Sequence, residues 1–252
     1  MQHPGSQPAI GFGLIIVGSE ILDGRVSDRH LASTSALLRE RRLDLRYAQI
    51  LPDDPEVIET QLRWAMDRGE PFFCCGGIGS TPDDYTRGCA ARAAGVPLAY
   101  HPRGVAILKQ RFGAQATPAR LRMVEFPQGA DLIPNPINQV PGFRIGNGHF
   151  LPGFPEMAHP MTAWVLDTWY APGVEKIARA LRLPGAREAD LVDLMEAFIA
   201  AHPDVTFSSL PAFTATGTEV KLGISGAREA VAAGLRDLTA ALDHAGIKYQ
   251  RL

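Results

Sequence analysis

Apolar runs alternate with helical spacings along the first part of the chain. The runs predict strands over residues 11–17, 45–51 and 72–75. Apolar positions at helical spacing predict helices that begin at Ser27 or Asp28, at residue 55 and at residue 83. Because strands and helices alternate, we expect an α/β domain whose sheet is mainly parallel and carries helices on both faces.

The pattern changes in the second half of the chain. Residues 143–145 and 149–151 flank the turn Gly146-Asn147-Gly148, which predicts a β-hairpin. A stiff turn over residues 151–157 then leads into a helix. The last part predicts, in order, elements over residues 175–183, 186–201, 204–210, 218–224, 227–245 and 247–252. Their order, strand–helix–strand–strand–helix–strand, matches a small α+β ferredoxin-like sandwich.

Proline is distributed unevenly and indicates a domain boundary. Eleven of the 20 prolines lie between Pro97 and Pro172. We therefore expect a boundary after a helix that ends near Tyr170. The predicted organisation is an extended or disordered tail over residues 1–9, an α/β domain over residues 10–172 and a small α+β domain over residues 173–252.

Charge and composition exclude several classes of protein. Lys and Arg number 25 and Asp and Glu 27, so the net charge of −2 argues against binding to nucleic acid or anionic lipid by bulk charge. No apolar stretch reaches the roughly 18 residues of a membrane span, and the N-terminus lacks the layout of a signal peptide. Three cysteines, two of them adjacent, form neither a disulfide framework nor a CxxC metal pair. We expect a cytoplasmic protein with no membrane partner.

The strongest candidate site is the glycine-rich segment 76–81, directly after the third predicted strand. Ligands of open α/β sheets bind at this edge, where glycines let backbone N–H groups approach a phosphate. The candidate phosphate-binding residues are Gly76, Gly77, Gly79, Ser80 and Thr81. Asp83 and Asp84 follow at once and would repel phosphate, so a bridging divalent cation is expected. The alternative is a turn followed by an acidic helix cap.

Carboxylates also follow the other two predicted strands of this sheet. Glu20 comes after the first strand and Asp53 after the second. Because parallel strands end at one edge, these acids should converge on the glycine-rich segment. The alternatives are a loop with surface acids for Glu20 and a helix cap for Asp53. The turn with Pro152, Gly153 and Glu156 is expected either to hold a ligand against the same edge or to be a stiff connector.

Five segments in order resemble the MoaB/Mog (molybdopterin-binding-like) domain family, and within it the N-terminal domain of the competence/damage-inducible protein A (CinA) group. They are GSEILDGRVSDRHLASTSALL, ILPDDPEVIETQL, CCGGIGSTPDDYT, NPINQVPGF and LPGFPEM. The resemblance covers about residues 10–170. It implies a three-layer MoaB/Mog-like domain, usually a homo-oligomer, followed by a small KH-like domain. The C-terminal deamidase domain of many members has no match, so no deamidase activity is expected.

The resemblance implies metal-dependent hydrolysis. CinA-like domains are linked to divalent-metal-dependent hydrolysis of ADP-ribose to AMP and ribose 5-phosphate. We therefore expect a nucleotide pyrophosphatase that acts on ADP-ribose or a related dinucleotide with Mg, Mn or Co. The predicted catalytic residues are Asp83, Asp84 and Asp53, and the predicted metal ligands are Glu20, Asp83 and Asp84.

Two other hypotheses stay open. Ser19 and Ser80 stand where the family usually has Asp and Pro, and the segment 135–142 lacks the family's Gly-Thr pair. These departures favour a molybdopterin- or nucleotide-binding module without turnover. A third hypothesis gives the C-terminal domain an RNA- or protein-binding role through a GXXG match at residues 223–226. That match falls at a predicted strand end and not between two helices, so nucleic acid is not an expected partner.

Overall fold

The computed structural model describes residues 11–173, 175–214 and 217–252. The predicted tail over residues 1–9 lies outside the described residues. The chain divides into two compact units after Gly173. The N-terminal unit has a six-stranded sheet, a two-stranded sheet and two hydrophobic core clusters, and the C-terminal unit has a four-stranded sheet and one cluster.

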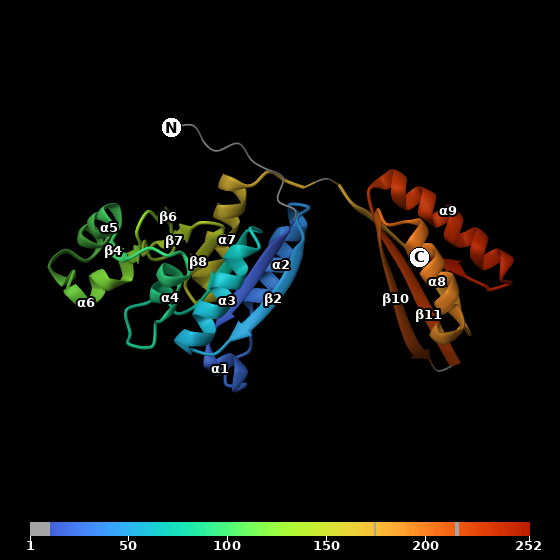
Figure 1. Cartoon of the computed structure of the whole chain (residues 1–252), viewed down its shortest axis with the longest axis horizontal. Coiled ribbons are helices and arrows are strands. Elements are labelled where there is room, and N and C mark those ends of the chain that lie inside the picture. Colours follow the sequence, from blue (N-terminus) through green and yellow to red (C-terminus); the bar gives the residue numbers. More distant parts are fainter. Residues whose placement is uncertain (1–10, 174, 215–216) are drawn as a thin grey trace. The chain divides into compact units, whose positions relative to one another are not determined.

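The N-terminal unit is built on a six-stranded sheet in the order β2-β1-β3-β8-β7-β6 (Figure 1). Its strands are β1 (Phe12–Val17), β2 (Leu45–Leu51), β3 (Phe72–Cys75), β6 (Asp131–Ile133), β7 (Gly142–Ile145) and β8 (Gly148–Leu151). The four strands from β2 to β8 run parallel, β7 is antiparallel to β8, and β6 is antiparallel to β7 and so runs in the direction of the other four. This arrangement confirms the predicted α/β fold with a mainly parallel sheet.

Helices cover both faces of this sheet. The helices of the unit are α1 (Ser19–Leu22), α2 (His30–Glu40), α3 (Pro55–Asp67), α4 (Thr86–Ala93), α5 (Pro102–Phe112), α6 (Pro118–Leu121) and α7 (Pro155–Trp169). Helices α2 and α7 lie on one face of the sheet, and α3 and α4 lie on the other. Alternate residues of β1 enter different cores: Leu14 and Ile16 pack in the core that α2 and α7 join, and Ile15 packs with residues of α3 and α4. Because successive strand side chains point to opposite faces, a fully apolar central strand is the local cause of the three-layer fold.

The proline-rich region contains regular elements that the sequence did not reveal. They are β4 (Leu98–Tyr100), β5 (Glu125–Pro127), β6, α5, α6 and two 3-10 turns, Gly113–Gln115 and Arg122–Val124. Pro102 and Pro118 each occupy the first turn of a helix, where a missing N–H is tolerated. These prolines therefore mark helix starts as well as turns.

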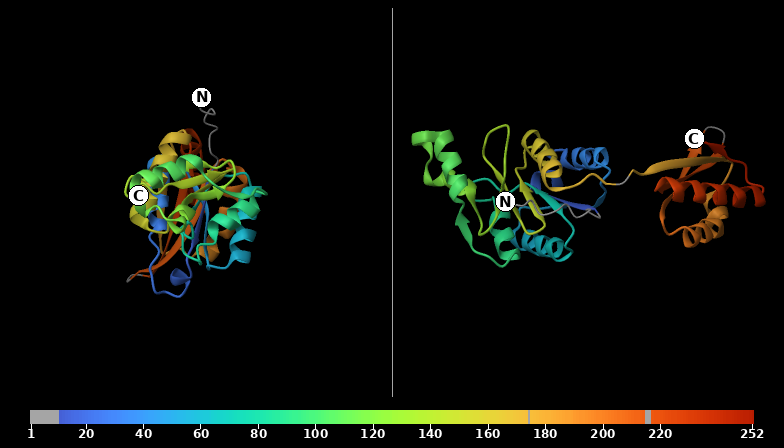
Figure 2. Two further views of the ribbon diagram at one scale, coloured as in Figure 1. Left: turned by 90° about the vertical axis from the view of Figure 1, so that its left-hand side faces the viewer. Right: turned by 90° about the horizontal axis from the view of Figure 1, so that it is seen from above.

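The C-terminal unit is an antiparallel sheet in the order β10-β11-β9-β12 with two longer helices (Figure 2). Its elements are β9 (Ile177–Pro184), a 3-10 turn (Glu188–Leu191), α8 (Val192–Ala201), β10 (Val205–Thr214), β11 (Gly217–Gly226), α9 (Arg228–His244) and β12 (Gln250–Arg251). Val220, Leu222 and Ile224 alternate along β11 and pack against α8 and α9. The GXXG match at residues 223–226 lies within β11, so it does not form a loop between helices.

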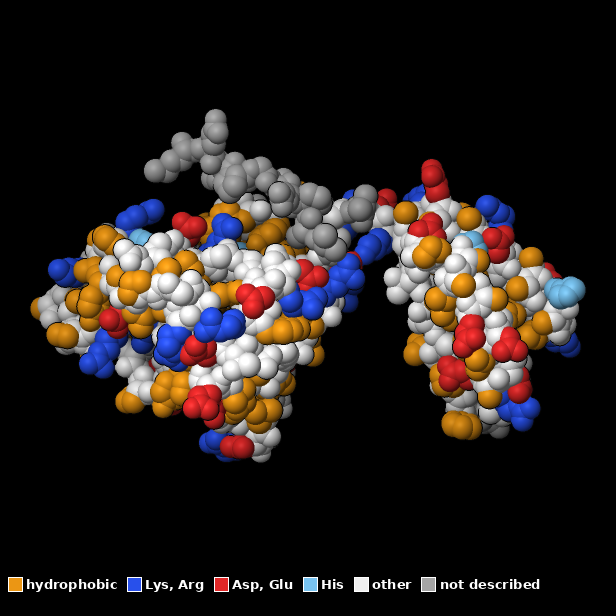
Figure 3. Space-filling model, viewed as in Figure 1, with side chains coloured by type: hydrophobic (Ala, Val, Ile, Leu, Met, Phe, Trp, Pro, Cys, Tyr) orange, Lys and Arg blue, Asp and Glu red, His pale blue; other side chains and the backbone are white. Residues whose placement is uncertain are grey.

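The molecular surface agrees with the small net charge. On the face drawn in Figure 3, acidic and basic side chains are interspersed over both units. Among the described residues, no helix is both long and apolar enough to cross a membrane.

Candidate functional site

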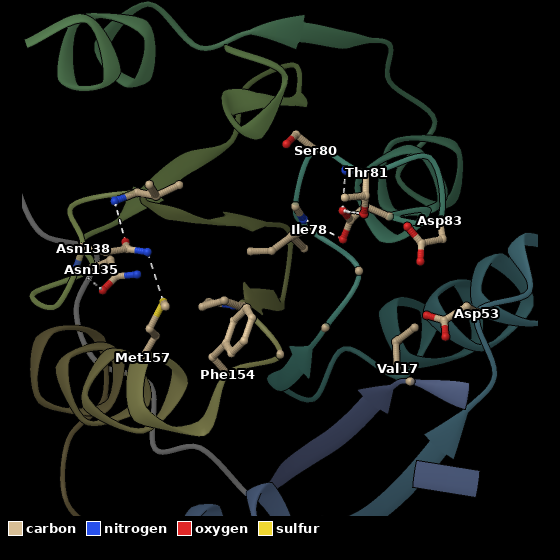
Figure 4. Close-up of a pocket in the computed structure, with 18 of the residues that line it drawn as sticks. Val17, Asp53, Ile78, Ser80, Thr81, Asp83, Asn135, Asn138, Phe154 and Met157 are labelled. Carbon is tan, nitrogen blue, oxygen red and sulfur yellow. Dashed lines mark hydrogen bonds between the residues drawn. The ribbon is translucent and has the colours of Figure 1, made fainter. Parts of the chain in front are cut away.

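A cavity of about 510 Å³ lies at the carboxyl edge of the parallel strands (Figure 4). Its lining comes from the ends of four strands, with Val17 closing β1, Asp53 following β2, residues 76–81 following β3 and Pro152 following β8. Since these strands are parallel and adjacent, their carboxyl ends meet at one edge of the sheet. The fold therefore places the glycine-rich segment and the acidic loops around one hollow.

The glycine-rich segment turns sharply because two of its residues adopt positive φ. Gly76 has φ +106° and Gly77 has φ +66°, and a Cβ on Gly76 would lie 2.2 Å from the carbonyl oxygen of Val17. The Gly76 N–H donates to the carbonyl of Leu151 at 3.0 Å. The N–H groups of Gly77, Ile78 and Ser80 donate to no described residue, so they are available to an anionic ligand.

Asp84 closes this segment into a loop. One carboxylate oxygen accepts the Gly79 N–H at 2.8 Å, and the other accepts the Thr81 N–H at 2.8 Å together with the Thr81 hydroxyl. Helix α4 consequently begins at Thr86 and not at residue 83 as the pattern predicted. Asp84 therefore acts first as a support for the loop.

The hydrogen bonds of the Asp84 carboxylate should contribute measurably to the stability of the N-terminal unit. Asp84→Asn puts an amide NH₂ where a carboxylate accepts N–H donors, so we expect the free energy of unfolding to fall by about 1–2 kcal/mol. Asp83→Asn is the matched control, because Asp83 is exposed and its change should cost less than about 0.5 kcal/mol. Denaturant unfolding followed by tryptophan fluorescence measures both. Equal stability of the two variants would contradict the role given to Asp84.

Ser19 and Asp53 join the loops after β1 and β2. The Ser19 N–H donates to Asp53 Oδ2 at 2.8 Å, and the Asp53 N–H donates to the Ser19 hydroxyl at 2.9 Å. Glu20 lies beside this pair, with its carboxylate folded back over Gly18. Ser19, which stands where the family usually has an acid, therefore fixes the position of Asp53.

The lining gathers most of the predicted site residues. Those that line the cavity are Glu20, Asp53, Gly76, Gly77, Gly79, Ser80, Thr81, Asp83, Asp84, Pro152 and Gly153. Glu156 is not among the lining residues. Its carboxylate instead pairs with Arg29 at 2.8 Å on the surface, and the pKa of Glu156 is lowered by a backbone hydrogen bond and by this pairing.

The charges around the cavity have one sign. Four carboxylates line it, and the described lining residues include no Lys, Arg or His. A phosphate ligand would meet repulsion there unless a cation accompanied it. Within the described ranges, however, no three His, Cys, Asp or Glu groups come together closely enough to hold a metal ion. The predicted metal set Glu20, Asp83 and Asp84 thus lines one cavity without forming one ligand cluster.

The other wall of the cavity comes from residues that were not singled out individually. Asn135, Asn138, Val140, Pro141, Phe154 and Met157 line it. Figure 4 shows Asn135 and Asn138 across the cavity from Asp53 and Asp83. The Asn135 side-chain oxygen accepts the N–H groups of Ile137 and Asn138, which shapes the 135–142 segment. The flanking prolines of that segment were the available sequence signal.

Known proteins share this architecture. A family model described as "Probable molybdopterin binding domain" matches residues 13–171. CinA-like proteins of Sulfurihydrogenibium sp. (strain YO3AOP1) and Geobacter sp. (strain M21) are 30% and 33% identical over 71% and 74% of this chain. The structure titled "The crystal structure of the protein CinA with unknown function from Thermoplasma acidophilum" matches with TM-score 0.58 and 29% identity, over 63% of this chain and 97% of that one.

The curated relatives are longer than the part that aligns with this chain. The aligned part is 47% of each of the two CinA-like proteins, so the chain spans about half their length. The family match covers the N-terminal unit, which contains the whole lining of the cavity.

Proposed function

Because the chain belongs to the MoaB/Mog family of molybdopterin-binding domains, we propose that its cavity binds and hydrolyses a nucleotide pyrophosphate. The substrate class is ADP-ribose or a related dinucleotide, which would yield AMP and a sugar phosphate. One observation carries the proposal: a glycine-rich loop with free N–H groups meets four carboxylates in one cavity. Free N–H groups suit a phosphate, and carboxylates suit a divalent cation.

A divalent ion fits this cavity if it enters with the substrate. The described residues do not supply three ligand groups at one point, but Mg²⁺ is usually held by one or two carboxylates together with substrate phosphates. Asp83, exposed at the cavity, and Glu20, half-buried beside Gly18, are the carboxylates that would complete such a shell. Bound Mg, Mn or Co would supply charge neutralisation and a more acidic attacking water.

Asp53 is the candidate general base. Its Oδ2 accepts the Ser19 N–H, which leaves Oδ1 to accept a proton from water. Attack of that water on phosphorus forms one P–O bond, breaks the bridging P–O bond and transfers the proton to Asp53. The N–H groups of Gly77, Ile78 and Ser80 would hold the phosphate oxygens during this step.

Release of AMP from ADP-ribose tests the proposal. We expect release with Mg²⁺, Mn²⁺ or Co²⁺, and a fall in kcat of about a hundredfold in Asp53→Asn, which keeps an acceptor for Ser19 but loses the base. Asp23→Asn is the control, because Asp23 lies on the same edge outside the cavity and pairs with Arg25. No release with any of the three metals, or unchanged release in Asp53→Asn, would overturn the proposal.

A second candidate function is binding without turnover. It is favoured by the hydrogen bonds that tie Asp53 and Asp84 into loops, since carboxylates used in this way are less free for chemistry. The ligand would then be molybdopterin or a nucleotide. Saturable binding of ADP-ribose in calorimetry with no AMP formed would favour this function over hydrolysis.

We also propose that the protein works in the cytoplasm as a homo-oligomer. The three cysteines are buried and free, which suits a reducing compartment. Sedimentation of the purified chain tests the oligomeric state, and a monomer at micromolar concentration would contradict it.

A further inference from the structure

A second cavity of about 670 Å³ lies in the N-terminal unit and shares Asn135 and Pro141 with the first. Helix α5, the β6–β7 pair and helix α7 contribute its other walls. On α5, Arg103, Ile107 and Gln110 follow one another at spacings of four and three, so their side chains share one face of the helix. The proposed function uses none of these residues.

The charges of the second cavity differ from those of the first. Arg103 and Arg144 line it, and neither forms an ion pair with any residue that the structure describes. Asp131, opposite Arg144 in the β6–β7 pair, is the one carboxylate among the described lining residues. The second cavity therefore carries an excess of positive charge, whereas the first carries four carboxylates, so an anion without a metal favours the second.

Aromatic rings form part of the wall. Trp164 and Trp169 meet edge to face, with ring centroids 5.2 Å apart. The Arg144 guanidinium lies 5.0 Å from the Trp169 ring centroid, and its Nε donates to the Gly146 carbonyl at 3.3 Å. Both contacts hold the guanidinium in place. Indole and guanidinium surfaces of this kind stack on the flat faces of heteroaromatic rings.

We propose that the second cavity is a separate binding site for a nucleoside monophosphate. The phosphate lies between Arg103 and Arg144, and the base lies against Trp164 and Trp169. The cavity volume falls in the range of small-molecule sites. Because the cations belong to the protein, binding needs no divalent metal, and the proposal does not depend on hydrolysis in the first cavity.

Tryptophan fluorescence tests this site directly. The chain has three tryptophans, so a Trp64→Phe variant leaves only Trp164 and Trp169 as reporters. AMP is titrated into this variant in the presence of a chelator, and we expect saturable quenching. Arg103→Gln combined with Arg144→Gln should raise the Kd at least tenfold. Arg111→Gln should leave the Kd unchanged, because Arg111 lies on the same helix but does not line the cavity.

Parallel titrations separate the two halves of the ligand. Adenosine should bind more weakly than AMP, and inorganic phosphate should compete with AMP without quenching. Three outcomes would overturn the proposal. They are absence of saturable quenching, an unchanged Kd in the double arginine variant with its circular dichroism spectrum intact, and quenching that appears only when a divalent metal is added. A dimer in sedimentation that Trp169→Ala dissociates, with no AMP bound, would assign this surface to a second copy of the chain and would also overturn it.

Discussion

Gly76→Ala is expected to abolish ligand binding in the first cavity and to lower the free energy of unfolding by about 3 kcal/mol. Gly76 has φ +106°, where a side chain is strained by about 1–2 kcal/mol. The new Cβ would also lie 2.2 Å from the Val17 carbonyl oxygen, and relief of that overlap costs a further 1–3 kcal/mol or so. The overlap can be relieved only if the ends of β1 and β3 move apart, and this movement would displace the glycine-rich segment that follows β3.

Gly95→Ala is the matched control for this substitution. Gly95 also has positive φ, +69°, but nothing lies within 4 Å of a Cβ built there. Gly95→Ala should therefore be destabilised only by the backbone strain, by about 1 kcal/mol, and should keep ligand binding. Denaturant unfolding followed by tryptophan fluorescence reports the N-terminal unit alone, because Trp64, Trp164 and Trp169 all lie in it. Equal losses in the two variants would show that the contact with Val17 does not matter.

Much of the fold could be predicted because the local patterns of its strands are strongly marked. The buried runs of β1 and β3, the hairpin of β7 and β8, and the element order of the C-terminal unit all follow from local patterns. Asp28, one of the two residues expected at the start of this helix, accepts the N–H groups of His30 and Leu31 at 2.8 and 3.0 Å, although α2 itself begins at His30. Each of these features depends on residues close together in the sequence.

Features that depend on side-chain partners far along the chain could not be predicted. Local spacing cannot show that Asp53 is held by Ser19, 34 residues away, or that Glu156 pairs with Arg29. The role of Asp84 was hidden for another reason, because an acidic residue before a helix has the same composition whether it caps the helix or closes a loop. The second cavity combines residues of α5, β7 and α7, which only the tertiary fold brings together.

Acidification is expected to destabilise the N-terminal unit through His149. Burial lowers the pKa of His149 to about 3, with the nearby Arg144 charge acting in the same direction. The ring makes two hydrogen bonds: Nδ1 lies 3.0 Å from the Phe72 carbonyl, and Nε2 lies 3.1 Å from the Tyr170 hydroxyl. Since a carbonyl only accepts, Nδ1 carries the proton and Nε2 accepts the hydrogen bond from Tyr170. The folded state therefore holds a neutral imidazole.

The sign of the pH effect follows from these two protonation states. The unfolded chain protonates His149 near pH 6.5, whereas the folded chain resists protonation down to about pH 3. Between these values the unfolded state binds more protons, so stability is fully present above pH 6.5 and falls as the pH is lowered. The slope for this one group approaches about 1.4 kcal/mol per pH unit, with a total on the order of 5 kcal/mol across this window. Burial also lowers the pKa of His159 on α7, which adds to the same trend.

Because other groups contribute, the test is the difference between two pH profiles. His149→Asn keeps an N–H donor for the Phe72 carbonyl but cannot be protonated, so its stability should fall less steeply between pH 6.5 and pH 4. His101→Asn is the control, because asparagine preserves the cap that His101 provides at the start of α5. Unfolding followed by tryptophan fluorescence at each pH gives the profiles. A buried imidazole that stays neutral requires the free energies of unfolding of the wild type and His149→Asn to converge as the pH falls. Parallel dependence on pH in the two proteins would instead mean that the folded unit accommodates a protonated His149.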